Sequence, residues 1–194
     1  MGVLAKNLFL VKEHVGMFKA ANNYDIHDPY TNEIIIECRE NNLGFITKLL
    51  RFSDYKRMTP FNIEISDAQG NLLLRVSRGI SIFLSDVKVH DGEGNLIGGF
   101  KQKFFSIGGK FDVQDPSGNT LCNLKGTWTG WNFRFLAGER ELAQVSKEWA
   151  GLGKEMFTSA DNYALSISSD VSEDAPVRKL ILAAVMCIDM VLKE

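Results

Sequence analysis

The stretch FNIEISDAQGNLLLRV, residues 61–76, shows the local pattern on which the fold depends. Apolar Phe61, Ile63 and Ile65 alternate with polar residues, which is the two-residue period of a strand with one buried face. Asp67 begins a type I turn through its side-chain oxygen, and Gly70 suits the left-handed position that follows. Apolar residues resume after the turn. The stretch therefore predicts a β-hairpin.

The same pattern recurs along the chain and predicts a sheet built of hairpins. Two further tight copies lie at residues 87–96 and 111–121, and looser copies lie at residues 24–32 and 131–139. The tight copies follow one another about every 24 residues, which a solenoid or a meandering antiparallel sheet could produce. The copies drift at both ends, which favours the meander. Residues 144–147 and 163–168 bring the total to roughly twelve strands, a number that favours a closed barrel.

The C-terminal region predicts one helix. The segment Ser172-Glu173-Asp174-Ala175-Pro176 is typical of a helix start, with two acidic residues, Asp174 as a possible N-cap and proline inside the first turn. From Leu180 to Leu192 the sequence is apolar on every side apart from Asp189, and such a helix must be buried in protein or in lipid. These residues span about 20 Å, whereas the hydrocarbon core of a bilayer is about 30 Å thick. We expect the helix to fill the barrel; a tilted or partial membrane insertion is the alternative.

Together these patterns predict an all-β fold with one C-terminal helix: a closed, roughly twelve-stranded antiparallel barrel enclosing a central hydrophobic α-helix. We expect residues 1–194 to form a single domain, with residues 175–193 as the central helix.

Composition limits the classes of function. The 194-residue chain carries a net charge of −2, which argues against nucleic-acid binding and against a polybasic membrane coat. Its three cysteines, Cys38, Cys122 and Cys187, are odd in number and widely spaced, so a disulfide framework is not expected. A reducing compartment follows from this, and no targeting signal is evident near the N-terminus. We expect a cytoplasmic protein.

Several segments together resemble the phospholipid scramblase family. They are residues 57–75, which read RMTPFNI and continue through Asp67, Gly70 and Asn71 to Arg75; the pairs and triplets Ile97-Gly98 and Lys101-Gln102-Lys103; residues 110–115; and Asp161-Asn162-Tyr163 followed by the short apolar helix with Cys187-Ile188-Asp189. The similarity runs from about Tyr24 to the end of the chain. The wider group includes the plant LURP-one-related proteins and the tubby C-terminal domain.

This resemblance implies both a fold and a function. The fold is a twelve-stranded barrel around a hydrophobic C-terminal helix, in agreement with the reading of the residues. The function is calcium-activated, energy-independent movement of phospholipids between leaflets, and tubby relatives bind phosphoinositides. The sequence departs from the family in three places, the first being the proline-rich N-terminal tail that members often carry, where this sequence is expected to start directly with a strand. Residues 78–83 contain no cysteine where relatives often carry a palmitoylated cluster, and Ser159 stands where relatives have Asp.

Two acidic segments are candidates for calcium. Oxygen ligands are available at Asp161, Asp170, Glu173 and Asp174, near the helix start. However, the alternation of Tyr163, Leu165 and Ile167 favours a strand followed by an acidic helix cap. Residues 91–95 begin like an EF-hand loop, but Leu96 stands where that loop requires glycine, so a hairpin turn is predicted. We expect no cofactor, with calcium as the alternative.

Catalytic signatures are missing from the sequence. His14, His27 and His90 follow no metal-ligand or triad spacing, and no nucleophile or phosphate-loop motif occurs. The chain is not expected to be an enzyme.

Lipid headgroups are the ligand that the basic residues favour. Lys101, Lys103 and Lys110 lie on or beside one predicted hairpin, with Phe104 and Phe105 between them. Phosphate contact with aromatic insertion is one reading, and a solvated strand face is the other. We predict a peripheral domain that binds an anionic phospholipid membrane surface, with transbilayer lipid movement as a further activity. The alternative is a soluble protein-interaction or regulatory module that binds a protein partner and has no lipid activity.

Overall fold

The computed structural model describes residues 2–14, 21, 23–41, 44, 47, 50, 58–80, 86–102, 111–127, 132–147 and 162–192. A short 3-10 helix, η1 (Val3–Ala5), precedes the first strand. The strands are β1 (Leu8–Glu13), β2 (Tyr24–His27), β3 (Ile34–Glu40), β4 (Phe61–Asp67), β5 (Leu72–Arg78), β6 (Asp86–Asp91), β7 (Leu96–Gln102), β8 (Phe111–Gln114), β9 (Thr120–Thr127), β10 (Asn132–Ala137), β11 (Arg140–Ser146) and β12 (Asn162–Ile167). The helix α2 (Pro176–Leu192) follows.

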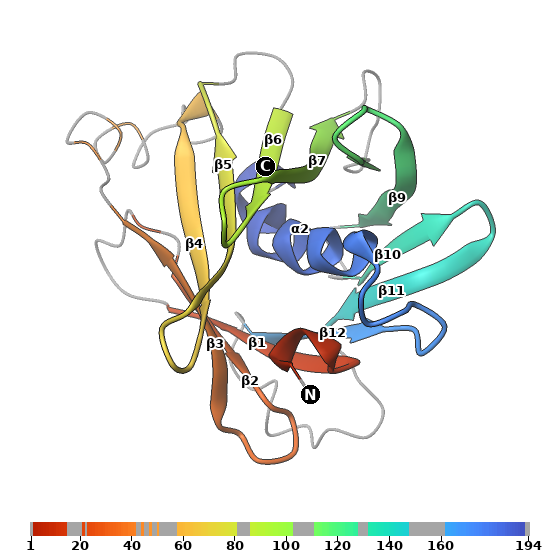
Figure 1. Ribbon diagram of the computed structural model, residues 1–194, viewed down its shortest axis with the longest axis horizontal. Coiled ribbons are helices and arrows are strands. Elements are labelled where there is room, and N and C mark those ends of the chain that lie inside the picture. Colours follow the sequence, from red (N-terminus) through yellow and green to blue (C-terminus); the bar gives the residue numbers. More distant parts are fainter. Residues whose placement is uncertain are drawn as a thin grey trace.

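These twelve strands form one closed antiparallel barrel around the helix, as the hairpin repeat predicts (Figure 1). Each strand pairs with its neighbours in sequence, and β1 pairs with both β2 and β12, which closes the sheet. Closure leaves no unpaired strand edge, which removes a route to edge-to-edge aggregation.

The repeated turn motif has the predicted geometry. In the β4–β5 turn, the Asp67 amide donates to the Asn71 carbonyl at 3.0 Å, and the Gly70 amide donates to the Asp67 carbonyl at 3.0 Å. The φ angle of Gly70 is 84°, in the left-handed region that glycine reaches without a steric penalty. A register shift directly precedes the turn, between Ile65 and Ser66. The turn therefore carries a β-bulge, which increases the local twist and helps the sheet to curve.

Successive antiparallel strands place the connections alternately at two ends of the barrel. We call one end the turn end; it carries the tight turns at residues 28–33, 67–71, 91–95, 115–119 and 138–139. We call the other end the connection end. Strands that begin or finish there are joined in the sequence by residues 14–23, 41–60, 79–85, 103–110, 128–131 and 147–161. Residues 2–7 and the start of α2 belong to the turn end, because β1 begins there and β12 finishes there.

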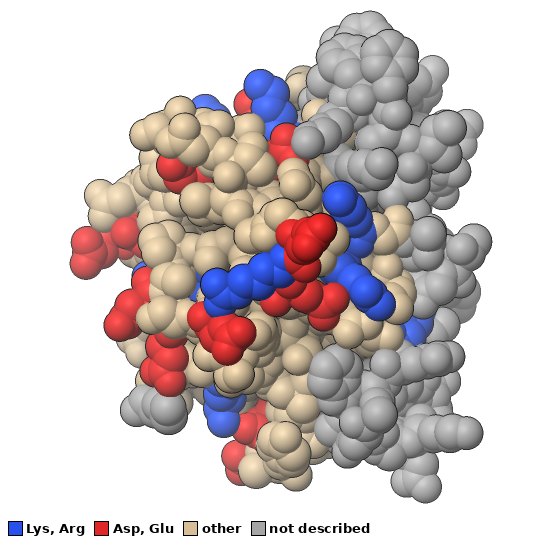
Figure 2. Space-filling view, turned by 90° about the vertical axis from the view of Figure 1, so that its right-hand side faces the viewer, with Lys and Arg blue, Asp and Glu red and all other residues tan. Residues whose placement is uncertain are grey.

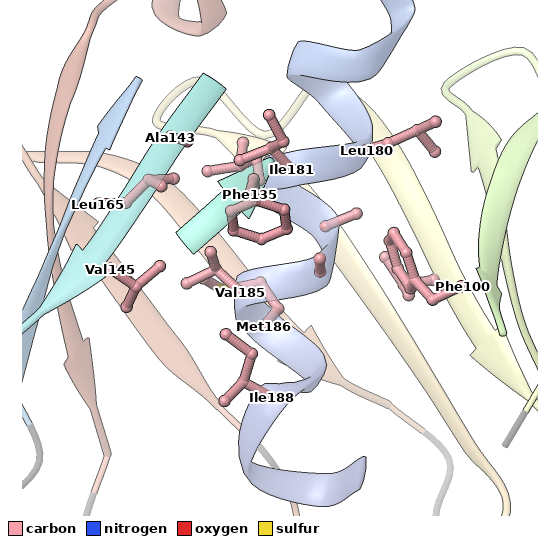
Figure 3. Close-up of a cluster of buried hydrophobic side chains, with 14 of the residues drawn as sticks. Phe100, Phe135, Ala143, Val145, Leu165, Leu180, Ile181, Val185, Met186 and Ile188 are labelled. Atoms are coloured by element: carbon pink, nitrogen blue, oxygen red, sulfur yellow. The ribbon is translucent and has the colours of Figure 1, made fainter. Parts of the chain in front are cut away.

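Helix α2 fills the interior of the barrel. Its described side chains from Leu180 to Met186, and Ile188, are all buried. Figure 3 shows Ile181, Val185 and Ile188 facing the wall that carries Phe135, Val145 and Leu165, while Leu180 points to the opposite side, toward Phe100. The apolar run of α2 that starts at Leu180 has apolar residues on every side, and the barrel wall surrounds it. This confirms the predicted burial in protein.

The start of α2 differs slightly from the sequence-based expectation. The helix begins at Pro176, one residue after the expected start at residue 175, and proline in this first turn costs no hydrogen bond. Ala175 occupies the N-cap position, and its own amide donates to the Ser172 carbonyl at 3.1 Å. Asp174, which the sequence suggested as N-cap, lies one residue earlier in this turn.

One glycine allows the helix to approach the wall. A Cβ at Gly98 of β7 would lie 2.2 Å from the Gln114 carbonyl oxygen and 2.9 Å from Cδ1 of Leu180. The φ angle of Gly98 is +144°, which side-chain-bearing residues rarely adopt. A larger residue here would collide with both the neighbouring strand and the helix.

The first prediction tests the buried helix. Val185→Asp places an unpaired carboxylate in the barrel interior and should lower the free energy of unfolding by about 4 kcal/mol or more. The matched control Ile80→Asp makes the same kind of change at a residue that is 77% exposed, and should alter stability by less than about 0.5 kcal/mol. Denaturant unfolding of both variants measures the difference. Equal stability of the two variants would contradict burial of the helix.

The second prediction concerns the close approach at β7. Gly98→Ala should destabilise the protein by about 2 kcal/mol or more, through overpacking and backbone strain. Gly79→Ala is the control, because a Cβ at Gly79 meets no atom within 4 Å. The melting temperatures of the two variants, compared with wild type, give the result. A Gly98→Ala protein as stable as the control would show that the helix does not touch this strand.

Candidate functional site

Lys101 lies on the outer wall of the barrel, near the connection end. It is exposed, and its direct cross-strand partners are Asp86 of β6 and Asp112 of β8. Two carboxylates therefore flank this lysine and reduce the positive potential around it. The other two predicted lipid contacts, Lys103 and Lys110, lie outside the described residues, as do Phe104 and Phe105.

Charges of both signs alternate over the outer wall. Arg75 of β5 donates to Glu64 of β4 at 2.8 Å. Figure 2 shows Lys and Arg side chains beside Asp and Glu side chains across the centre of one face. The described strands thus favour the reading of Lys101 as part of a solvated, charge-balanced wall over that of a concentrated basic patch.

Two basic residues nevertheless stand directly opposite each other. Lys125 of β9 is the cross-strand partner of Arg134 of β10, and both are exposed. Arg134 also lies 3.5 Å from a carboxylate oxygen of Glu141. Like charges in such a pair repel, and a bound anion would relieve this repulsion. The sequence analysis missed the pair because its two members lie in different strands and only the register brings them together.

The predicted calcium segment is described only in part. Ser159 and Asp161 lie outside the described residues, whereas Asp170 is exposed and its carbonyl accepts a hydrogen bond from Arg140 at 2.8 Å. Residues 162–167 form strand β12, in line with the expected strand before the helix. Within the described ranges, no three His, Cys, Asp or Glu residues gather as metal ligands.

The EF-hand-like segment at residues 91–95 is a hairpin turn, as predicted. One carboxylate oxygen of Asp91 accepts from the Glu93 amide at 3.0 Å and from the Asn95 amide at 2.8 Å. Asp67 and Asp115 are held in the same way by their own turns. The hydrogen bond from the following Asn side chain and the backbone amides together outweigh desolvation and lower the pKa of all three carboxyl groups. These carboxylates are therefore bound within their turns.

Two of the three histidines, His14 and His27, take part in separate structural contacts. His14 Nε2 lies 2.5 Å from Asp25 Oδ2, and Arg39 donates to Oδ1 of the same carboxylate at 2.6 Å. Burial alone would raise the pKa of Asp25, but the hydrogen bonds from His14 and Arg39 lower it overall. His27 Nδ1 lies 2.8 Å from the Asn32 carbonyl oxygen. The contacts of Asp25 with Arg39 and His14 thus pair charged groups on the outer wall, whereas the contact of His27 is with a neutral carbonyl.

Thiol chemistry is disfavoured at the two described cysteines. Cys38 and Cys122 are both buried. Burial, with a smaller contribution from Asp112, raises the pKa of Cys122 to about 12, so the thiol stays protonated and unreactive at neutral pH.

The turn end contains a buried guanidinium that the sequence analysis did not single out. Arg178, in the first turn of α2, is only 2% exposed. It donates to neutral oxygens: from Nε to Leu4 O at 2.8 Å, from Nη1 to Val171 O at 3.1 Å, and from Nη2 to Ala5 O at 2.9 Å, Asn7 Oδ1 at 2.6 Å and Lys6 O. Burial lowers the pKa of Arg178, with Glu173 acting in the opposite direction. The available signal in the sequence was the position of Arg178 directly before the apolar run that starts at Leu180.

The connection end contains a second buried arginine. Arg78 closes β5, is 4% exposed, and donates to the Thr59 carbonyl at 2.7 Å. Its guanidinium carbon lies 4.8 Å from the centre of the Phe61 ring, within range of a cation–π contact. The two-residue period places Arg78 on the same face as Leu74 and Val76, so the sequence did contain a signal for its inward orientation.

Membrane-spanning length is lacking in the helices that the structure describes. None of them is both long enough and apolar enough to cross a bilayer.

Comparisons with known proteins give one family model and several relatives. The family model described as Scramblase matches residues 6–194. The chain is 25% identical over 177 residues to the "Altered inheritance rate of mitochondria protein 25" of Saccharomyces cerevisiae, covering 78% of this chain and 54% of that protein. It is 20% identical over 192 residues to phospholipid scramblase 2 of Homo sapiens, covering 91% of this chain and 62% of that one. The chain thus spans less than two thirds of either relative.

A solved structure shares the fold. An X-ray structure of a protein from Arabidopsis thaliana matches with a TM-score of 0.54 at 14% identity, covering 97% of this chain and 98% of that one. At this level of identity, the match supports the barrel architecture alone.

The third prediction follows from the carboxylates in the turns. Because folding lowers the pKa of Asp67, Asp91 and Asp115, their stabilising contribution is present above the unfolded pKa of about 3.9. It is lost as the pH falls through the lower folded pKa. The triple variant D67N/D91N/D115N should lose this part of the acid dependence in melting curves recorded from about pH 7 to pH 2. Asp170→Asn, outside the hairpin turns, should retain it; identical acid profiles for the triple variant and wild type would contradict the assignment.

Proposed function

Because the chain belongs to the scramblase family, we propose that it is a phospholipid-interacting domain that binds an anionic membrane surface peripherally. The observation that carries this proposal is the burial of α2 inside the barrel. A helix whose described apolar side chains pack against the wall has none of that surface left for lipid. Contact with lipid therefore falls to the outer wall and to the segments at the connection end.

The basic residues proposed for this contact are Lys101, Lys103 and Lys110. They lie at or after the end of β7 in the sequence, and Lys101 is exposed. Each basic residue near an anionic surface contributes about 1 kcal/mol, so three give only weak attraction. Asp86 and Asp112 beside Lys101 reduce it further. The binding we propose is accordingly weak and salt-sensitive, since exposed charges are screened within about 10 Å at 0.1 M salt.

Transbilayer movement of phospholipid is the finer part of the proposal. It is supported by the family and by the printed names of relatives such as human phospholipid scramblase 2. We propose that such movement would use the outer surface of the domain and involve no catalytic chemistry. The cellular setting that fits this function is the cytoplasm, with peripheral attachment to a membrane.

A second function is favoured by the charge balance of the outer wall. Alternating rows such as Asp86, Lys101 and Asp112 give little net attraction to an anionic surface but suit a polar protein interface. On this alternative, the domain is an interaction or regulatory module for a protein partner and has no lipid activity.

The fourth prediction separates these functions by flotation. Purified protein should float with phosphatidylcholine vesicles that contain phosphatidylserine, and less so as the salt concentration rises. The triple variant K101Q/K103Q/K110Q should reduce the bound fraction several-fold. The control K12Q/K147Q/K179Q removes the same charge at positions away from β6, β7 and β8 and should leave binding close to wild type. Each experiment is run with and without calcium.

Three outcomes of the flotation experiment would contradict all or part of the proposed function. Equal binding to vesicles with and without phosphatidylserine would contradict electrostatic contact. A loss that is the same in both triple variants would contradict the proposed lysines while keeping lipid binding. Absence of binding to every vesicle would favour the protein-interaction module.

A further inference from the structure

The guanidinium of Arg178 joins the helix to two other segments at the turn end. Its acceptors lie in residues 4–7, before β1, and at Val171, between β12 and α2. Residues 4–7 are far from Arg178 in the sequence, whereas Val171 is close to it. A single side chain therefore joins the segment before β1 to the start of α2.

The electrostatic setting makes these acceptors essential to the burial of Arg178. All acceptors recorded among the described residues are neutral oxygens, and the cation lies in the first turn of α2. The helix dipole is positive at that end and disfavours a cation. A buried charge that loses its partners becomes strongly unfavourable. Without residues 4–7, the guanidinium would keep only the Val171 carbonyl among its recorded partners.

The segment that supplies most of the acceptors buries little apolar surface of its own, and apart from Arg178 it is held by a hydrogen bond from the Ile167 amide to the Asn7 carbonyl at 2.7 Å. Helix η1 contains no buried residue, and Val3 and Leu4 are only partly buried against the core. Lys6 adds an ion pair with Asp28 at 2.7 Å, in which the lysine side chain is 44% exposed. Segments with few buried contacts open locally at a much lower free energy than the whole domain.

We propose that residues 2–7 and Arg178 form a latch that retains α2 in the barrel. With the segment in place, the guanidinium is satisfied and the helix stays inside. When the segment is displaced, the buried cation loses most of its partners, and the first turns of α2 move toward solvent to hydrate it. This inference does not depend on lipid activity, so its failure and that of the proposed function are distinguishable.

The test is a cycle of full-length variants followed by amide hydrogen exchange. V3S/L4S removes the apolar contacts of the segment while adding no charge. Exchange in residues 176–186 should then become about tenfold faster or more, while strands β4 and β5 exchange as in wild type. V3S/L4S/R178M removes the cation as well, so the exchange of α2 should return to within about threefold of wild type.

A matched arginine provides the control. Arg140 donates to the Asp170 carbonyl at the same end of the barrel, but its side chain is 55% exposed. V3S/L4S/R140M should therefore show no rescue. A purely structural role of Arg178 would make R178M add to the damage rather than reverse it.

Two results would overturn the latch. One is fast exchange in residues 2–7 with wild-type exchange in α2, and the other is failure of R178M to rescue. Deleting residues 2–5 removes the Leu4 and Ala5 carbonyls outright and covers the case in which the serine variants leave the segment in place. Slow exchange of α2 in that deletion, or global unfolding that R178M does not reverse, equally contradicts the proposal.

Discussion

The interior of the barrel must be filled, and this constraint governs the rest of the structure. Twelve strands close around a lumen that the inward side chains of the wall share with α2. The helix in turn is apolar on every side, so it requires a surrounding apolar wall. Burial of each large apolar side chain is worth about 1.5–3 kcal/mol, and the described helix residues from Leu180 onward contribute several such terms. Without the other, either the wall or the helix would expose its apolar side chains to water.

This mutual dependence explains the local features of the wall. Close packing of a helix against a strand leaves no room for a side chain at Gly98, whose Cβ would meet both Leu180 and the neighbouring strand. The bulge at each turn increases the twist that a closed sheet needs. The two ends of the core are each marked by a buried arginine, Arg178 at the turn end and Arg78 at the connection end. Both guanidiniums donate to backbone carbonyls, which lets a charge lie at the border of an apolar interior.

The same constraint bears on membrane contact within the scramblase family. A helix used as the core of its own domain leaves the outer wall as the available surface, and that wall alternates positive and negative residues across its strands. The strongest apolar segment of the sequence thus serves stability, and under the proposed function recognition would use polar positions on the outside. A latch at the turn end would govern whether this separation holds.

Local pattern determined most of the fold. The Asp and Gly positions of the repeat specify the three tight turns at residues 67–71, 91–95 and 115–119 through side-chain hydrogen bonds and positive φ, and the two-residue period specifies which face is buried. The all-apolar stretch from Leu180 specifies a buried helix. These properties reside in neighbouring residues, so they can be read from the sequence. Arg78 could have been placed inside by the same period.

Tertiary structure alone decided which distant residues meet. The register places Asp86 and Asp112 beside Lys101, and Lys125 opposite Arg134, although nothing local to any of these residues indicates it. Likewise, most acceptors of Arg178 lie at the other end of the chain, in residues 4–7, and apart from Asn7 Oδ1 these are backbone carbonyls that every sequence possesses. Only closure of the barrel brings β1 beside β12 and hence the first residues beside the last helix. The cross-strand charges thus depend on the register of neighbouring strands, and the hydrogen bonds of Arg178 to residues 4–7 depend on closure, so neither could be read from the sequence.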